Sequence, residues 1–279
     1  MGHLIERLAR EELARLTLAD PTSAPHLRVV DDECSATGGI AAAEKLSSEQ
    51  PSLVIGHPCS NAAVAAAKVY ARSQTPFLAI GPRHPDITAK PAGPAVFRIG
   101  GRDDREAAET VAVFAPILIG QRLAIVHDRT AYAKGLADTV AAKFRAHGVP
   151  DITIEPIVAG ERDYAAVMAR LKSAGVAAVY FAGFPAEAAL IFDGLRKSGV
   201  VARFIGCGAL AGLKRPWLTV MAPRPLDEDR LAAVIRQALA AVIAHANGGE
   251  DVASALSREF DDEGDEKGPS FMPQPYPVE

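Results

Sequence analysis

The residue whose position suggests chemistry most directly is Ser60. It follows a short apolar run at 53–56 with the pattern of a buried strand, and it precedes an alanine-rich segment at 62–73 with helical spacing. Ser60 therefore stands at the predicted N-cap of a helix. Free backbone N–H groups at the start of a helix favour an anion such as a carboxylate. A serine that only caps its helix is the alternative, and the sequence leaves both interpretations open.

A second kind of chemistry would use the cysteine and histidines nearby. Cys59 or Ser60 could be a nucleophile with His57 or His84 as its base, because a neighbouring histidine can activate a thiol or a hydroxyl. No third group that would orient the base is evident. A metal site built from His57, Cys59 and His84 is not expected either, and the spacing of the three cysteines matches no metal motif. We therefore expect neither catalysis nor a bound metal or cofactor.

The elements that position Ser60 form a βαβ unit. A second apolar strand, at 76–80, follows the predicted helix. In an open parallel sheet, ligands bind at the loops that follow the carboxyl ends of the strands. The loop that holds Ser60 lies at such an end.

The same alternation of strand and helix continues along most of the chain. It indicates an α/β fold with parallel sheets. Residues 270–279 contain three prolines and are expected to form an extended tail. The predicted strands are 26–30, 53–56, 76–80, 96–99, 123–127, 152–157, 177–181, 204–206 and 218–221, and the predicted helices are 4–18, 36–48, 62–73, 105–118, 133–147, 164–173, 186–198, 226–246 and 252–260.

The bulk composition is that of a folded protein without a polyanionic partner. The 279 residues carry a net charge of −4, so nucleic acid is not an expected partner. No apolar run is long enough to span a bilayer, and the first residues lack the apolar core of a signal peptide. The three cysteines, Cys34, Cys59 and Cys207, would all be free thiols in the cytosol, or one pair and one odd cysteine outside it.

Several motifs in the same order resemble the leucine/isoleucine/valine-binding proteins. These are the substrate-binding components of ABC importers for branched-chain amino acids, and they have the type I periplasmic binding fold. The resemblance runs from about Ala9 to Leu210 and resumes at Phe260. The motifs are Asp31-Asp32-Glu33-Cys34, Val54-Ile55-Gly56-His57-Pro58-Cys59-Ser60, Phe97-Arg98, Gly101-Arg102-Asp103-Asp104, Ala124-Ile125-Val126-His127-Asp128, Tyr132-Ala133-Lys134-Gly135-Leu136-Ala137, Ala159-Gly160-Glu161-Arg162-Asp163-Tyr164 and Phe260-Asp261-Asp262-Glu263-Gly264-Asp265.

The resemblance implies two doubly wound parallel-sheet lobes joined by three hinge crossings, with a ligand clamped between them. The N-lobe would comprise 1–101 plus 224–255, and the C-lobe 102–223 plus 256–279. The chain begins after the point where the family has its signal peptide and first strand, so the N-lobe is expected to be incomplete. The resemblance also implies a disulfide between Cys34 and Cys59.

The ligand residues of the family transfer to this chain only in part. Ser60, with Asn61 beside it, matches the position that holds the ligand carboxylate. Tyr132 matches the aromatic residue that closes over the ligand, and Gly81 matches a position that uses its backbone. Three positions depart from the family pattern: Arg83 replaces a small hydroxyl residue, Phe184 a common tyrosine, and Gly208 the acid that pairs with the ligand ammonium.

The departure at Gly208 bears on the class of ligand. A buried ammonium without a counter-charge costs several kcal/mol. A free amino acid therefore needs Asp128, Glu161 or Glu187 as a substitute acid. Arg83 favours an anion without an amine, unless it only forms a surface pair with Asp86.

The expected function is that of a non-catalytic binding protein for an amino-acid-like or carboxylate solute. Its partner would be the membrane permease of an ABC importer, and its location the periplasm. A start at Met1 taken as real would instead place the chain in the cytoplasm. Two alternatives remain: a ligand-sensing regulator module of the same fold, and a degraded paralogue that binds no ligand.

Overall fold

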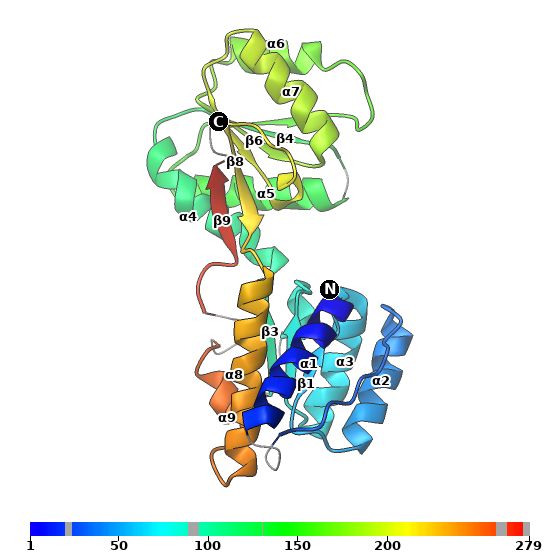
Figure 1. Cartoon of the computed structure of the whole chain (residues 1–279). Helices are drawn as coiled ribbons and strands as arrows, with labels where there is room; N and C mark the ends of the chain where they lie inside the picture. The colour runs from blue at the N-terminus through cyan, green and yellow to red at the C-terminus, as the bar shows by residue number, and fades with distance from the viewer. Residues whose placement is uncertain (20–23, 89–94, 130, 261–266, 276–279) are drawn as a thin grey trace. The chain divides into compact units, whose positions relative to one another are not determined.

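The chain folds into two compact units. The computed structural model describes residues 1–19, 24–88, 95–129, 131–260 and 267–275. Unit 1 comprises Met1–Asp103 and Pro225–Gly268, and unit 2 comprises Asp104–Arg224 and Pro269–Glu279 (Figure 1). The chain therefore crosses between the units three times.

The third crossing differs from the sequence-based boundary, which assigned 256–268 to the other lobe. Leu256 and Phe260 are buried in the core of unit 1. The Phe260 ring packs on the Phe97 ring with centroids 4.9 Å apart. This burial of apolar surface fixes the segment in unit 1.

Unit 1 is a three-stranded parallel sheet with helices on both faces. Its strand order is β1-β2-β3. Leu78 and Ile80 of β2 pack with α1, α8 and α9, whereas Phe77 and Ala79 pack with α2 and α3. Alternate residues of one strand thus face two helical layers, as the alternation along the chain predicts. The elements are α1 (Gly2–Ala19), α2 (Ala36–Ser48), β1 (Val54–Gly56), α3 (Ser60–Ser73), β2 (Phe77–Ile80), η1 (Pro85–Ile87), β3 (Val96–Ile99), α8 (Glu228–Ala246) and α9 (Val252–Ser257).

Unit 2 contains a six-stranded sheet of order β5-β4-β6-β7-β8-β9 around one hydrophobic core. Its first five strands are parallel, and β9 is antiparallel to β8. Helices α4 and α5 cover one face and α6 and α7 the other (Figure 1). The elements are η2 (Asp103–Arg105, at the first crossing), α4 (Glu106–Leu118), β4 (Leu123–His127), α5 (Ala131–Ala146), β5 (Ile152–Pro156), α6 (Ala165–Ser173), β6 (Ala178–Ala182), α7 (Pro185–Lys197), β7 (Arg203–Gly206), η3 (Gly208–Leu210), β8 (Leu218–Pro223) and β9 (Phe271–Pro275).

One predicted strand is absent, and one segment without a predicted strand forms one. The predicted strand at 26–30 is wrong, because residues 24–32 form no strand. A strand needs a hydrogen-bonded neighbour, and β1 is paired only with β2 among the described residues. Within the tail that was expected to be extended, Phe271–Pro275 pairs with β8 as an edge strand, the position where a sheet tolerates proline.

The loop between β1 and α3 is fastened by a disulfide. Cys34 and Cys59 are bonded, with their Cα atoms 5.3 Å apart, which confirms the predicted pairing. Cys59 is the N-cap of α3, and Ser60, predicted as the cap, is the first helical residue. Asp32 stabilises the turn that contains Cys34, because its Oδ1 accepts the Cys34 N–H at 2.9 Å.

A buried hydrogen-bond relay supports the same loop. His57 has a left-handed φ of 50°, which is strained for a residue with a side chain. Its Nδ1 lies 2.8 Å from Asp32 Oδ2, and its Nε2 lies 3.0 Å from the Tyr70 hydroxyl. Because a carboxylate only accepts, Nδ1 carries the proton and Tyr70 donates to Nε2. Burial lowers the pKa of His57 and raises that of Tyr70, so both groups are neutral in the folded protein.

Removal of the disulfide should destabilise unit 1. The bond closes a loop with a sequence separation of 25, for which the loop-entropy model gives about 3.5 kcal/mol. The double variant Cys34→Ser/Cys59→Ser should lower the free energy of unfolding, measured with a chemical denaturant, by about this amount. Reductant should destabilise the wild type and leave the double variant unchanged. Equal stability of the two proteins would contradict the expectation.

Acid should weaken unit 1 through His57. Its pKa is lower in the folded protein than the value of 6.5 in the unfolded chain, so the unfolded state binds more protons below about pH 6.5. The contribution is complete above pH 6.5 and is lost as the pH falls, by up to about 1.4 kcal/mol per pH unit. Denaturant titrations should show a steeper loss in the wild type than in His57→Gln. Parallel pH profiles would exclude this role.

Candidate ligand-binding site

The first turn of α3 presents uncapped backbone donors. The first helical backbone bond runs from the Ala63 N–H to the Cys59 carbonyl at 2.9 Å. The N–H groups of Ser60, Asn61 and Ala62 precede this bond. Cys59, whose sulfur is in the disulfide, makes no side-chain capping bond. In the described parts of the chain, no acceptor is found for these three donors.

The charge around this helix end also suits an anion. The first turn of α3 contains no acidic residue, and the positive end of the helix dipole lies there. Ser60 is half-buried and Asn61 is exposed. The turn can therefore hold a carboxylate through backbone N–H groups and the Ser60 hydroxyl.

The loop after β2 lies at the same sheet edge as the α3 N-terminus. Strands β1 and β2 are parallel neighbours in register, with Gly56 opposite Ala79. Their carboxyl ends therefore bring Ser60, Asn61, Gly81 and Arg83 to one edge of the unit 1 sheet. Gly81 has φ of 96°, a conformation that a residue with a side chain rarely adopts.

Arg83 pairs with Asp103 and not with Asp86. Its Nε donates to Asp103 Oδ1 at 2.8 Å, and its carbonyl accepts the Asp103 N–H at 3.1 Å. The Arg83 side chain is about one third exposed at this edge. The pair with Asp86, considered from the sequence, is replaced by one with a residue 20 positions away.

Sequence reasoning missed Arg98, which supports this loop from within the sheet. Arg98 lies on β3 and is fully buried. It donates to the His84 carbonyl at 2.5 Å and to Thr88 Oγ1 at 2.6 Å. An arginine inside the apolar run of β3 was the available signal. Its donors hold both ends of the segment that follows Arg83.

The predicted residues of unit 2 lie at the carboxyl ends of its strands. Phe184 follows β6, is the N-cap of α7 and is half exposed. Tyr132 lies in the first turn of α5, but its side chain lies outside the described residues. Gly208 begins η3 after β7, and its N–H donates to Glu106 Oε1 at 2.8 Å.

A side chain at position 208 would be crowded by residues of β8 and β9. A Cβ atom built there would lie 3.0 Å from the Phe271 ring and 3.3 Å from both the Met221 carbonyl oxygen and the Pro223 ring. An acidic side chain at this position would therefore require its neighbours in β8 and β9 to shift by a few tenths of an ångström.

The substitute acids considered from the sequence gather around Tyr164. Burial raises the pKa of this phenol most, and the negative charges of Glu187, Glu161 and Asp128 raise it further. Asp128 is buried at the end of β4, and Glu187 Oε1 accepts the Gly160 N–H at 2.9 Å. Unit 2 thus carries negative charge on the side where β4 and β6 end.

The groups considered for catalysis have structural partners. Cys59 is in the disulfide, and both ring nitrogens of His57 belong to the relay with Asp32 and Tyr70. His84 Nδ1 accepts the Asp86 N–H at 3.2 Å and caps η1. Within the described ranges, no group of three His, Cys, Asp or Glu residues could hold a metal ion.

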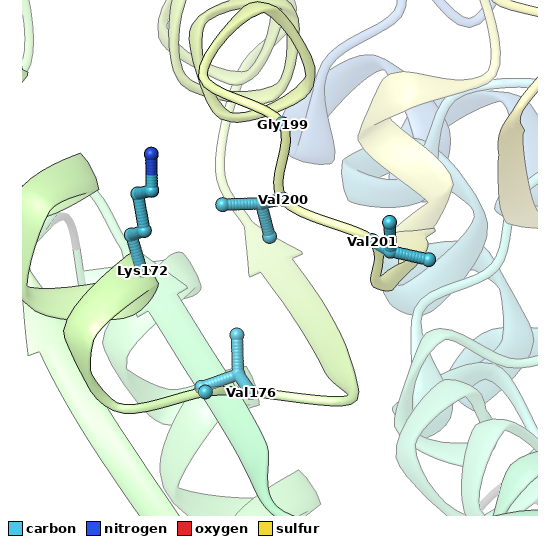
Figure 2. A pocket seen from close by; sticks show the side chains of 6 residues that line it. Lys172, Val176, Gly199, Val200 and Val201 are labelled. Carbon is cyan, nitrogen blue, oxygen red and sulfur yellow. The ribbon is translucent and has the colours of Figure 1, made fainter.

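A pocket of about 260 Å³ lies elsewhere in unit 2. Figure 2 shows Lys172, Val176 and Val200 around it. Lys172 lies in the last turn of α6, and Val176 and Val200 lie in the loops that lead into the amino ends of β6 and β7. The pocket therefore contains none of the candidate ligand residues.

None of the helices that the structure describes combines the length and the apolar character that a membrane crossing requires.

Comparisons with known proteins identify the family. The family described as periplasmic binding protein matches residues 26–276. A Leu/Ile/Val-binding protein homolog 1 from Brucella melitensis is 32% identical over 179 residues, which are 64% of this chain and 48% of that protein. The chain thus spans about half the length of the curated relatives it matches.

Solved structures share the fold. An ABC transporter substrate-binding protein from Desulfitobacterium hafniense in complex with Leu has a TM-score of 0.67 and 18% identity, over 97% of this chain and 95% of that one. A solute-binding protein of an ABC transporter from R. palustris in complex with benzoate has a TM-score of 0.57 and 14% identity, over 97% and 91%. The family match covers most of this chain, and the relatives confirm the resemblance to Leu/Ile/Val-binding proteins. The chain therefore belongs to the periplasmic binding protein family.

Proposed function

We propose that the protein is a substrate-binding component of an ABC importer and that it binds a small solute bearing a carboxylate. The observation that carries this proposal is the N-terminus of α3. Its N-cap is a disulfide-bonded cysteine without a capping acceptor, so three backbone donors remain for a ligand. Binding, without chemical conversion of the solute, is the activity that this arrangement serves.

Each candidate residue receives a role in this proposal. Ser60 and the N–H group of Asn61 hold the ligand carboxylate, and Gly81 and Arg83 line the adjacent wall of unit 1. The family resemblance assigns Tyr132 and Phe184 of unit 2 to the same ligand. Enclosure follows when the ligand binds the closed arrangement better than the open one.

A carboxylate without an amine is the ligand class that we favour. Gly208 offers no counter-charge to an ammonium, and a side chain there would be crowded by Phe271 and Pro223. The benzoate complex among the structural neighbours is an example of such a ligand in this fold. An amino acid would instead need the negative charge that Asp128 and Glu187 carry.

The importer and the compartment follow from the family. The partner would be the permease of an ABC transporter, and the location would be the periplasm. The Cys34–Cys59 disulfide supports an oxidising compartment.

Ligand panels should distinguish the two classes of solute. A ligand at 100 times its dissociation constant adds about 2.7 kcal/mol of stability. Thermal unfolding should shift upward with benzoate and related amine-free carboxylates and should not shift with L-leucine; benzylamine serves as the control without a carboxylate. A shift with L-leucine alone would indicate that another acid replaces the one absent at Gly208. Cooperative unfolding without any shift would favour the regulator or the non-binding paralogue.

Replacement of Ser60 should weaken binding of whichever carboxylate gives a shift. Ser60→Ala removes a hydroxyl that donates to a charged group, which is worth about 1–3 kcal/mol. Isothermal titration should show this loss in affinity, and Ser52→Ala, an exposed serine in the same unit, should bind like the wild type. Unchanged affinity of Ser60→Ala would remove Ser60 from the site.

A further inference from the structure

The three crossings enter unit 2 at neighbouring elements. Helix α4 begins just after the first crossing, β8 ends just before the second, and β9 begins just after the third. Strands β8 and β9 are paired, with Pro223 opposite Phe271. A residue that bonds α4 to the β8–β9 pair would therefore connect the segments at all three crossings.

Glu109 of α4 makes that connection. Its Oε1 accepts the Ser270 N–H at 2.8 Å, and its Oε2 accepts the Phe271 N–H. Hydrogen bonds to a carboxylate are stronger than those between neutral groups. Ser270 and Phe271 are both buried, so water does not readily replace these bonds.

The second crossing is held by the same segment. The Ser270 carbonyl accepts the Arg224 N–H at 2.9 Å. One short stretch, Ser270 and Phe271, is thus bonded to the residue that precedes the second crossing and to the helix that follows the first. Glu109 and Ser270 are 161 residues apart in the sequence, so local sequence patterns do not predict this contact.

On the unit 1 side, glycines with positive φ precede the first and the third crossing. Gly100 and Gly101 precede the first crossing, with φ of 116° and 82°, and Gly268 precedes the third, with φ of 103°. All three belong to unit 1. Hinge motion is absorbed by a few residues that tolerate large changes in backbone angles, and glycine tolerates them best.

We propose that Glu109 is a hinge-positioning residue, which fastens the third crossing to α4 so that all three crossings move with unit 2 as one piece. Bending then takes place on the unit 1 side, at Gly100, Gly101 and Gly268. The use of this hinge to enclose a ligand rests on the proposed function, but the fastening itself requires no ligand.

Hydrogen exchange of the ligand-free full chain tests the fastening. In Glu109→Ala, the amides of Ser270 and Phe271 should exchange about tenfold faster or more, because each loses a bond to a charged acceptor. Glu109→Gln, which keeps only one accepting oxygen, should be intermediate. Asp138→Asn, which removes an exposed carboxylate from a surface pair with Lys134, should exchange like the wild type. Protected β4 amides in every variant would show that unit 2 remains folded.

Distances between spin labels test the consequence. Labels at Glu44→Cys in unit 1 and Arg145→Cys in unit 2 use two exposed positions. Glu109→Ala should broaden the distribution of distances, and Gly268→Ala should narrow it. Gly248→Ala, at a glycine with φ of 84° and nothing within 4 Å of an added Cβ, should leave it unchanged. Wild-type exchange at Ser270 and Phe271 in Glu109→Ala, or an unchanged distribution in both hinge variants, would overturn the proposal. A failure to bind any solute would not affect either result.

Discussion

The bond between Cys34 and Cys59 is the constraint on which the candidate site depends. It fixes the loop after β1 and at the same time places a residue without a capping oxygen at the N-cap of α3. A serine or aspartate cap would satisfy one donor and stabilise the helix by about 1 kcal/mol. Helix α3 lacks this capping contribution, and the disulfide holds the helix end instead. The site gains free donors without a loss of rigidity.

Buried polar side chains support the rest of this edge. His57 is the buried first residue of the loop after β1, and Arg98 on β3 donates to the segment that follows β2. Each is costly to bury, and each is hydrogen-bonded to groups on a neighbouring segment, so removal of either would leave buried partners unsatisfied. These polar residues therefore act on the site through the backbone of its loops, although neither is assigned a contact with a ligand.

Local patterns in the sequence predicted the helices, most strands and the doubly wound arrangement, because apolar spacing and helix caps act over a few residues. The disulfide followed from the family resemblance. What failed depended on partners distant in sequence. The segment 26–30 has the composition of a strand but no strand beside it, and Arg83 finds Asp103 in place of Asp86. The strand that contains Arg98 was predicted, but the role of Arg98 was not. The groups that accept its hydrogen bonds lie in the loop that precedes the strand.

The proposed ligand class depends on such distant packing as well. The space beside Gly208 is filled by Phe271 and Pro223, which face each other in the β8–β9 pair. Glu109 anchors the beginning of β9 through two backbone N–H groups. A side chain at position 208 would therefore press on residues of a strand pair whose β9 member is bonded to both β8 and α4. The proposed preference against an ammonium therefore involves the C-terminal strand and its anchor as well as the residue at position 208.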